Sequence, residues 1–198
     1  MLERLENIFL RIWRLRHMYG FGVQSPSAYS FIRNIVNEKY PYYDYSDLKA
    51  QFPHAAYLSR KLGELYFRIA NAYQPKTWFS YLPSSDIYSS YVNLGCQQTV
   101  IAHIDPKPDQ DLPDQLNHFD LAYVNLIQEG IPVGEKLLHL ADQHSILILE
   151  QIHSNKQNRH FWRQVIASPL TCLTFDLYYC GIVFFDRTKS KQNFIVNF

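Results

Sequence analysis

From residue 77 onward, short apolar runs alternate with segments in which apolar residues recur at helical spacing. Short apolar runs separated by helices are typical of strands buried on both faces of a parallel sheet. The runs predict seven strands, at residues 77–82, 99–104, 119–124, 145–152, 172–178, 181–185 and 193–198. Helices are expected at residues 87–94, 134–142 and 159–167. The predicted fold class is therefore α/β, with a seven-stranded, mostly parallel sheet and helices on both of its faces.

The last three apolar runs follow one another without a helical segment between them. Parallel neighbours need a long crossover, so the missing helix predicts that the chain ends in an antiparallel C-terminal hairpin. The connection between residues 181–185 and 193–198 contains Lys189 and Lys191. This polar segment is expected to be a hairpin loop.

The first part of the chain is predicted to be helical. Apolar residues recur at helical spacing over residues 2–16, which indicates an amphipathic helix. Ser25 and Pro26 are typical of an N-cap and a first helical position, so a second helix is expected over residues 25–37. A third helix is expected over residues 62–73, before a proline that would end it.

Two further features of this part concern packing. Residues 39–53 are rich in Tyr, Pro and Asp, which predicts a loop whose aromatic side chains fold against the body. Glu64 and Arg68 are four residues apart, a spacing at which an ion pair supports a helix. We expect residues 1–74 to form an α-helical N-terminal extension packed on a core of residues 75–198, as a single globular unit.

Composition and charge narrow the class of protein. The 19 basic and 18 acidic residues leave a net charge of +1, which argues against a nucleic-acid-binding stripe. The 3 cysteines form no CxxC pair and have no metal-ligand spacing, so we expect reduced thiols and no bound metal. No apolar run approaches the roughly 18 residues that a membrane span needs, and charges interrupt any secretory signal. These features predict a cytoplasmic protein.

Two segments and the order of the elements resemble a known family. The segment GFGVQSPS at residues 20–27 is similar to GFGVHSPF, which is found in a bacterial group related to small-molecule O-methyltransferases. The segment FDLYYCGIVFF at residues 175–185 is similar to the ending of that group. The order of elements resembles that of class I S-adenosylmethionine-dependent methyltransferases. The resemblance, which extends nearly end to end, implies a Rossmann-like seven-stranded sheet with a terminal antiparallel hairpin.

The resemblance also implies a site for S-adenosylmethionine. In such methyltransferases the first strand ends in an acidic residue, and a glycine-rich loop then passes under the cofactor. Here Ser80 stands in place of the acid, and Leu82 and Asp86 stand in place of glycines, so this loop is degenerate. Asp105, at the end of the second strand, is expected to bind the ribose hydroxyls, and Asn125 replaces an acid of the family. The cofactor-binding candidates are Ser80, Tyr81, Ser84, Ser85, Asp105 and Asn125.

Glu150 and His153 are the candidates for catalysis on the acceptor side. They leave the carboxyl end of a central strand, the edge at which open parallel sheets bind ligands. Methyl transfer needs positioning and often a base for the acceptor hydroxyl, so His153 could serve as the base with Glu150 orienting it. The alternative is a solvated pair at a strand end. Asp176, inside an apolar strand, is expected to be partly buried and hydrogen-bonded.

Two functions of different class stay open at this point. The first is a methyltransferase acting on a small hydroxylated acceptor. The second is a degenerate methyltransferase fold that has lost cofactor binding and serves as a binding or assembly module. Residues 2–16 could form a homo-oligomer or lie on a membrane surface. Ser84 and Ser85 could act as caps of the following helix instead of binding a cofactor.

Overall fold

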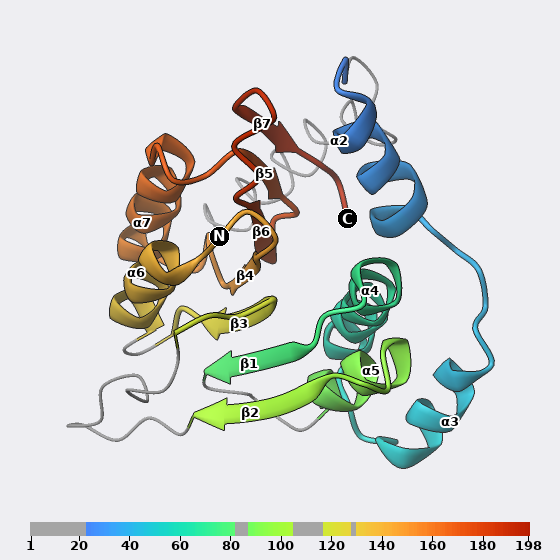
Figure 1. Cartoon of the computed structure of the whole chain (residues 1–198). Helices are drawn as coiled ribbons and strands as arrows, with labels where there is room; N and C mark the ends of the chain where they lie inside the picture. The colour runs from blue at the N-terminus through green and yellow to red at the C-terminus, as the bar shows by residue number, and fades with distance from the viewer. Residues whose placement is uncertain (1–22, 82–86, 105–116, 128–129) are drawn as a thin grey trace, which may run out of the picture.

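The computed structural model describes residues 23–81, 87–104, 117–127 and 130–198. Seven described strands form one sheet in the order β2-β1-β3-β4-β6-β5-β7 (Figure 1). The strands are β1 (Thr77–Tyr81), β2 (Val100–Ile104), β3 (Leu121–Asn125), β4 (Ile146–Glu150), β5 (Leu173–Asp176), β6 (Cys180–Phe184) and β7 (Gln192–Ile195). All of them run in one direction except β6, which is antiparallel to β4 and β5. The prediction of a seven-stranded, mostly parallel sheet is confirmed.

The end of the chain differs in part from the prediction. β5 and β6 form an antiparallel hairpin, but β7 pairs with β5 in parallel register. The expected pairing of the last two strands with each other is therefore wrong. β7 stays beside β5 because the rings of Phe194 and Phe175 stack at 5.3 Å, and because the Val196 N–H donates to the carbonyl of Asp176. The buried backbone of β5 thereby gains partners along both edges.

Helices cover both faces of the sheet, as predicted (Figure 1). One side carries α2 (Pro26–Phe31), the π-helical turn η2 (Ile32–Val36), α3 (Asp44–Gln51), α4 (Tyr57–Tyr73) and α5 (Ile87–Gly95). The other side carries α6 (Gly130–Leu140) and α7 (Lys156–Ala167). The helices predicted between the strands are confirmed, with ends that differ by a few residues. None of the described helices has the length and apolar character to cross a membrane.

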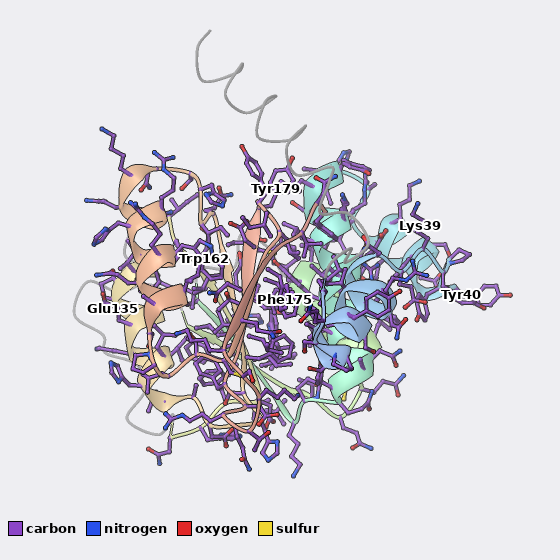
Figure 2. All side chains as sticks on the ribbon, turned by 90° about the horizontal axis from the view of Figure 1, so that it is seen from above. Lys39, Tyr40, Glu135, Trp162, Phe175 and Tyr179 are labelled. Carbon is purple, nitrogen blue, oxygen red and sulfur yellow. The ribbon has the colours of Figure 1, made fainter. Side chains whose placement is uncertain are left out.

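Each face of the sheet buries its own apolar core. Trp78 of β1 packs on the side of α4 and α5, and the next residue, Phe79, packs on the side of α6 and α7. This alternation follows because successive residues of a strand point to opposite faces. Trp162 and Phe175 lie on opposite sides of the sheet (Figure 2). Gly181 lets α7 approach β6, since a Cβ at this position would lie 2.5 Å from the Trp162 ring.

The described part of the N-terminal segment is largely helical. Residues 1–22, which include the helix predicted at residues 2–16, lie outside the described residues. Ser25 caps α2 as predicted, because its Oγ accepts a hydrogen bond from the N–H of Ala28 at 3.4 Å. The third predicted helix is α4, which ends at Tyr73 and is followed by the C-cap residue Gln74, whose φ of 48° is left-handed.

One prediction for this segment is wrong. Residues 39–53 are not a loop throughout, because they include α3. Leu48 is the buried residue of that helix, so the sequence there has no apolar stripe to indicate a helix. Arg68 of the predicted Glu64–Arg68 pair is only 6% exposed, and its Nε donates to the carbonyl of Ile35 at 2.6 Å. Burial raises the pKa of Glu64, and the positive charge of Arg68 opposes this rise.

The aromatic residues of this segment do pack against the body, as predicted. The ring centroids of Tyr42 and Tyr45 lie 4.8 and 5.2 Å from that of Phe67 in α4. The Tyr45 ring also lies 6.1 Å from Tyr91 of α5. Edge-to-face and tilted pairs at these distances stabilise beyond the area that they bury. These tyrosines therefore pack the segment that precedes α4 against the helices that cover the sheet.

Candidate functional site

The strand order places a topological switch point at the carboxyl ends of β1 and β3. β1 lies between β2 and β3, and α5 and α6, which follow β1 and β3, pack on opposite faces of the sheet. In open α/β sheets, ligands bind at the carboxyl edge where the chain switches direction in this way. The turn after β1, in which the family's glycines are replaced, lies outside the described residues. So do three of the predicted cofactor-binding residues, Ser84, Ser85 and Asp105.

Ser80 and Tyr81 are buried on opposite faces of β1. The Oγ of Ser80 lies 2.6 Å from Nδ1 of His103, its neighbour on β2. Nε2 of His103 lies 3.4 Å from the Oγ of Ser89 in α5. Tyr81 packs in the core under α6 and α7. The side chains of both predicted residues are therefore part of the packing that holds the end of β1. The sequence did not point to His103, because only the parallel register of β1 and β2 brings it beside Ser80.

Asn125 ends β3 at the switch point and is half-buried. Its Oδ1 accepts a hydrogen bond from the N–H of Ile127 at 3.0 Å. α6 starts directly against this turn, because a Cβ on Gly130 would overlap the carbonyl of Asn125. The structure thus holds a polar amide at the place where the sequence predicted cofactor binding.

Glu150 is enclosed by tyrosine hydroxyls. The carboxyl is only 4% exposed, and it accepts hydrogen bonds from Tyr66 at 3.0 Å and from Tyr123 at 2.7 Å. Tyr88, whose ring centroid lies 5.3 Å from that of Tyr123, lies beside the same carboxyl. Burial raises the pKa of Glu150 above its ordinary value, and the three hydroxyls lower it only in part. The alternative of a solvated strand-end pair therefore does not hold for Glu150.

His153 is held by a different carboxylate. Its Nε2 lies 2.7 Å from Oδ2 of Asp176, and its ring stacks on that of Tyr178 with 5.6 Å between centroids. Asp176 is 6% exposed and also accepts from the N–H of Tyr178 at 2.9 Å. The expectation of a buried, hydrogen-bonded Asp176 is confirmed. Asp176, rather than the expected Glu150, orients the histidine.

The backbone next to His153 is strained. Gln151 and Tyr178 have φ angles of 65° and 73°, in the left-handed region. The N–H of Gln151 donates to the carbonyl of Tyr179 at 2.9 Å, so the two strained segments touch. A left-handed conformation costs a non-glycine residue about 1–2 kcal/mol, and such strain tends to gather at functional sites. The strain therefore indicates that the part of the carboxyl edge near His153 is a candidate functional site.

A cavity of about 440 Å³ opens beside the start of α5. Its lining consists of Gln51, Phe52, Pro53, His54, Ala55, Ser59 and Ile87. Ile87 follows the turn that leaves β1, and Ser59 lies in the first turn of α4, whose other end leads into β1. The cavity therefore lies toward the carboxyl edge of the sheet. A volume of a few hundred Å³ and a mainly apolar wall are typical of small-molecule sites.

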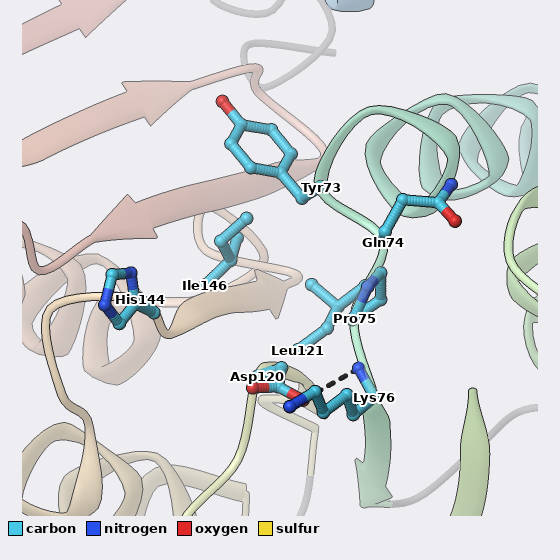
Figure 3. Close-up of a pocket in the computed structure, with 8 residues that line it drawn as sticks. All are labelled: Tyr73, Gln74, Pro75, Lys76, Asp120, Leu121, His144 and Ile146. Atoms are coloured by element: carbon cyan, nitrogen blue, oxygen red, sulfur yellow. Dashed lines mark hydrogen bonds between the residues drawn. The ribbon is translucent and has the colours of Figure 1, made fainter. Parts of the chain in front are cut away.

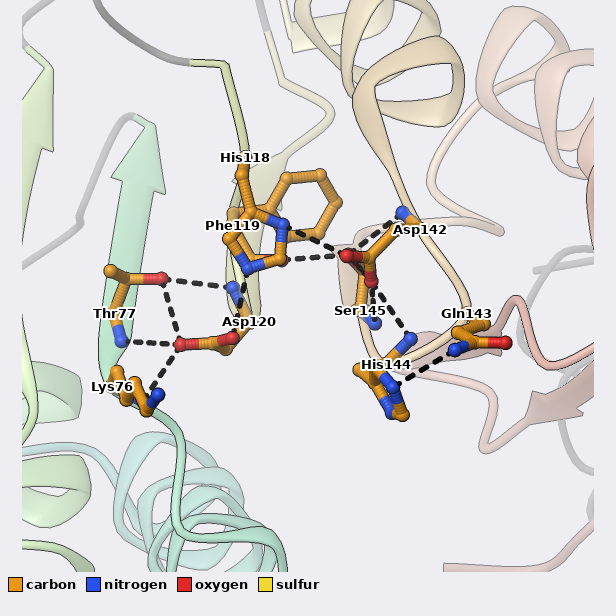
Figure 4. Close-up of polar contacts among 9 residues, drawn as sticks. All are labelled: Lys76, Thr77, His118, Phe119, Asp120, Asp142, Gln143, His144 and Ser145. Carbon is orange, nitrogen blue, oxygen red and sulfur yellow. Dashed lines mark hydrogen bonds and ion pairs between the residues drawn. The ribbon is translucent and has the colours of Figure 1, made fainter.

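At the opposite, amino-terminal edge of the parallel strands, the side chain of Asp120 hydrogen-bonds the start of β1 (Figure 4). Oδ2 of Asp120 accepts from the N–H groups of Lys76 at 2.8 Å and Thr77 at 2.9 Å. His118 lies between Asp120 and Asp142, with nitrogen–oxygen distances of 3.0 and 3.2 Å. A second cavity, of about 260 Å³, lies beside Lys76 and Asp120 (Figure 3). We assign this network, the Asp120 clamp, to the stability of the sheet because it lies far from the carboxyl edge.

The described part of the chain contains no group of three or more His, Cys, Asp or Glu side chains that could hold a metal ion. The cysteines are buried and form no disulfide. Burial raises the pKa of the Cys172 and Cys180 thiols. A thiol of raised pKa is a poor source of the thiolate that metals and electrophiles require.

The sequence matches no family model and no curated protein. The structure is similar to that of a methyltransferase from Podospora anserina bound to S-adenosylhomocysteine, with a TM-score of 0.58 and 12% identity over 80% of this chain and 93% of that one. The chain has a class I methyltransferase fold. An O-methyltransferase from Bacillus cereus in complex with S-adenosylhomocysteine has a TM-score of 0.46 and 10% identity, over 79% of this chain and 96% of that one.

The methyltransferase fold confirms the architecture that the resemblance implied. Its open, mostly parallel sheet has helices on both faces and an antiparallel strand, β6, inserted near the end. Asn125 and the carboxyl end of β1 lie at the switch point of this fold. His153 and Asp176 lie farther along the same edge, beyond β4.

Proposed function

We propose that this chain is an S-adenosylmethionine-dependent methyltransferase that acts on a small hydroxylated acceptor. The observation that carries the proposal is a methyltransferase fold whose carboxyl edge gathers Asn125, Glu150, His153 and Asp176. The cavity of about 440 Å³ on the same side supports a small-molecule ligand.

The cofactor would bind around the end of β1 and β3. The half-buried amide of Asn125 can both donate and accept hydrogen bonds, as the polar groups of a nucleoside require. Asp105 would accept hydrogen bonds from the ribose hydroxyls, and Ser84 and Ser85 would complete the site after β1. When bound, S-adenosylmethionine would supply an electrophilic methyl group. The buried residues Ser80 and Tyr81 would support this site from within the sheet.

The acceptor hydroxyl needs a group that takes its proton. An ionised Asp176 can only accept a hydrogen bond, so Nε2 of His153 would carry a proton and Nδ1 would be the basic nitrogen. The carboxyl of Glu150, with its raised pKa, is the second base at this edge. The proposal therefore contains two groups that can serve the acceptor.

A thermal-shift titration with S-adenosylhomocysteine tests the cofactor site. A ligand at 100 times its dissociation constant stabilises the folded state by about 2.7 kcal/mol, so the melting temperature should rise. Asn125→Ala should reduce the shift, whereas the exposed control Arg187→Ala should leave it unchanged. A wild-type chain that shows no shift with either S-adenosylmethionine or S-adenosylhomocysteine would refute the proposal and favour a binding module.

The proposal retains two predictions from the sequence, a cytoplasmic location and a homo-oligomer formed through residues 2–16. Size-exclusion chromatography of a variant without residues 1–18 tests the second. An elution volume that reports the same number of subunits in both chains would contradict it.

A further inference from the structure

A hydrogen-bonded turn holds His54 in the wall of the 440 Å³ cavity. The turn spans residues 52–55, with Pro53 in its second position and His54 in its third. The N–H of Ala55 donates to the carbonyl of Phe52 at 3.1 Å, which closes the turn. Proline is favoured in the second position because its ring fixes φ. The backbone therefore sets His54 at a defined place beside the cavity.

The residues on either side of this turn anchor it to the body. Phe52 and Ala55 are half-buried and pack against the core that lies under α4 and α5. Both of them also line the cavity. His54 is exposed, so a ligand that enters the cavity can reach its ring. The site therefore combines a fixed backbone with an accessible imidazole.

The chemistry of the lining favours an uncharged ligand. None of the described residues that line the cavity is a lysine, an arginine, an aspartate or a glutamate. A charged ligand would lose its hydration there without gaining an opposite charge. The ring of Phe52 and the side chain of Ile87 offer apolar surface, and Gln51 and Ser59 can hydrogen-bond polar groups. An apolar wall with a few polar groups suits a small molecule that carries a hydroxyl.

His54 is better placed to meet such a ligand than the two bases considered above. Neither Glu150 nor His153 belongs to the lining of the cavity. Glu150 is only 4% exposed, and tyrosine hydroxyls already donate to its carboxyl. Imidazole is the side chain that can take up a proton near neutral pH. Because Ile87 is the first residue of α5, which follows β1, the cavity also lies toward the site proposed for the cofactor.

We propose that His54 takes the proton of an uncharged acceptor that binds in this cavity, an inference that rests on the function proposed above. The O–H bond of the acceptor breaks, and its oxygen keeps the electron pair. The proton goes to a ring nitrogen of His54 and later passes to solvent, because the ring is exposed. One proton moves and no electron is transferred. The imidazolium that forms compensates the negative charge of the acceptor oxygen.

Binding of para-nitrophenol tests this assignment without the cofactor, because its phenolate absorbs visible light and its neutral form does not. At a pH below the probe's own pKa, the wild-type chain should bind it as the phenolate. His54→Gln should bind the probe with a similar dissociation constant but give a phenolate absorbance roughly tenfold lower. His160→Gln is the matched control, since it removes an exposed histidine from α7, on the other face of the sheet, and it should keep the signal.

Two further variants locate the probe and the proton. Ala55→Phe places a ring in the cavity and should abolish binding of the probe; undiminished binding would place the probe elsewhere and overturn the inference. If this variant does not fold, as judged by circular dichroism, Gln51→Trp at an exposed position of the same wall takes its place. A phenolate signal lost in His153→Ala but kept in His54→Gln would assign the proton to the other histidine and overturn the inference. A wild-type chain that does not bind the probe, or binds it only in its neutral form, would also overturn it.

The titration with S-adenosylhomocysteine, made on the same proteins, reports separately on the proposed function. A chain that deprotonates the probe but does not bind S-adenosylhomocysteine would keep the proton-accepting role of His54 and refute the methyltransferase. A chain that binds S-adenosylhomocysteine but leaves the probe neutral would keep the methyltransferase and refute the role of His54. The two failures are therefore distinguishable.

Discussion

Replacing Asp120 by alanine should destabilise the chain by about 1.5–4 kcal/mol. Its Oδ2 accepts from the N–H groups of Lys76 and Thr77 at 2.8 and 2.9 Å, and Oδ1 pairs with His118 at 3.0 Å. A hydrogen bond to a charged acceptor contributes about 1.5–3 kcal/mol. The side chain is 22% exposed, so water would replace part of what the two N–H groups lose. We therefore count about half of the summed contribution of the two backbone hydrogen bonds to the free energy of unfolding. The ion pair with His118 adds up to ~1 kcal/mol.

Urea denaturation at neutral pH measures this loss from the transition midpoint, provided that the slope of the transition is unchanged. Asp120→Asn is the matched control. Its amide oxygen can still accept from the backbone, but the charge is gone, so the loss should be smaller than for alanine. If Asp120→Ala costs less than about 0.5 kcal/mol, as an ordinary surface substitution does, the reasoning about the Asp120 clamp is refuted.

The same carboxylate should make stability depend on pH. Burial alone would raise the pKa of Asp120, but hydrogen bonds from His118, Thr77 and Lys76 outweigh it and lower the pKa below its ordinary value. Such a group stabilises fully above its unfolded pKa, and its contribution is lost as the pH falls through its folded pKa. Asp120→Asn should therefore lessen the loss of stability below about pH 4. Identical acid profiles for the two chains would contradict this account.

Three other substitutions test separate features of the fold. Gly181→Ala should lower stability by about 1–3 kcal/mol, because its Cβ would lie 2.5 Å from the Trp162 ring, and an unchanged melting temperature would count against this. Arg68→Met should cost about 1–3 kcal/mol in urea denaturation, since the Ile35 carbonyl loses its 2.6 Å partner; equal midpoints would show that water replaces it. Wild-type stability should fall as the pH rises from the ordinary glutamate pKa through the raised folded pKa of Glu150. Glu150→Gln should remove that slope, measured as urea midpoints against pH, and a slope that persists would argue against the buried carboxyl.

The central strands could be predicted closely because each is a short apolar run between polar residues. The strand expected at residues 145–152, for example, is Ile146–Glu150. α3 could not be predicted, because Leu48 is its one fully buried apolar residue among the described side chains, and a single apolar position makes no stripe. The partner of β7 could not be predicted either. Its choice of neighbour depends on contacts between distant residues, such as Phe194 on Phe175, which no local pattern contains.

The location of the candidate site could be predicted, but not which side chains hydrogen-bond each other within it. The rule that ligand groups follow the carboxyl ends of parallel strands pointed to Glu150 and His153. Asp176 was recognisable as a polar residue inside an apolar strand, but its histidine partner is 23 residues away. The hydroxyls around Glu150 come from α4, α5 and β3, which only the packing of a helical layer on the sheet brings together.

Because β7 flanks β5, a nascent chain cannot complete the sheet on the ribosome until residues 192–196 have emerged. Before that moment β5 would present an unpaired backbone edge, which is a template for pairing with other nascent chains. The Val196 N–H binds the carbonyl of the residue whose carboxylate holds His153. A chain terminated before Val196 would therefore lack one of the backbone hydrogen bonds that hold Asp176, and its β5 edge would stay open.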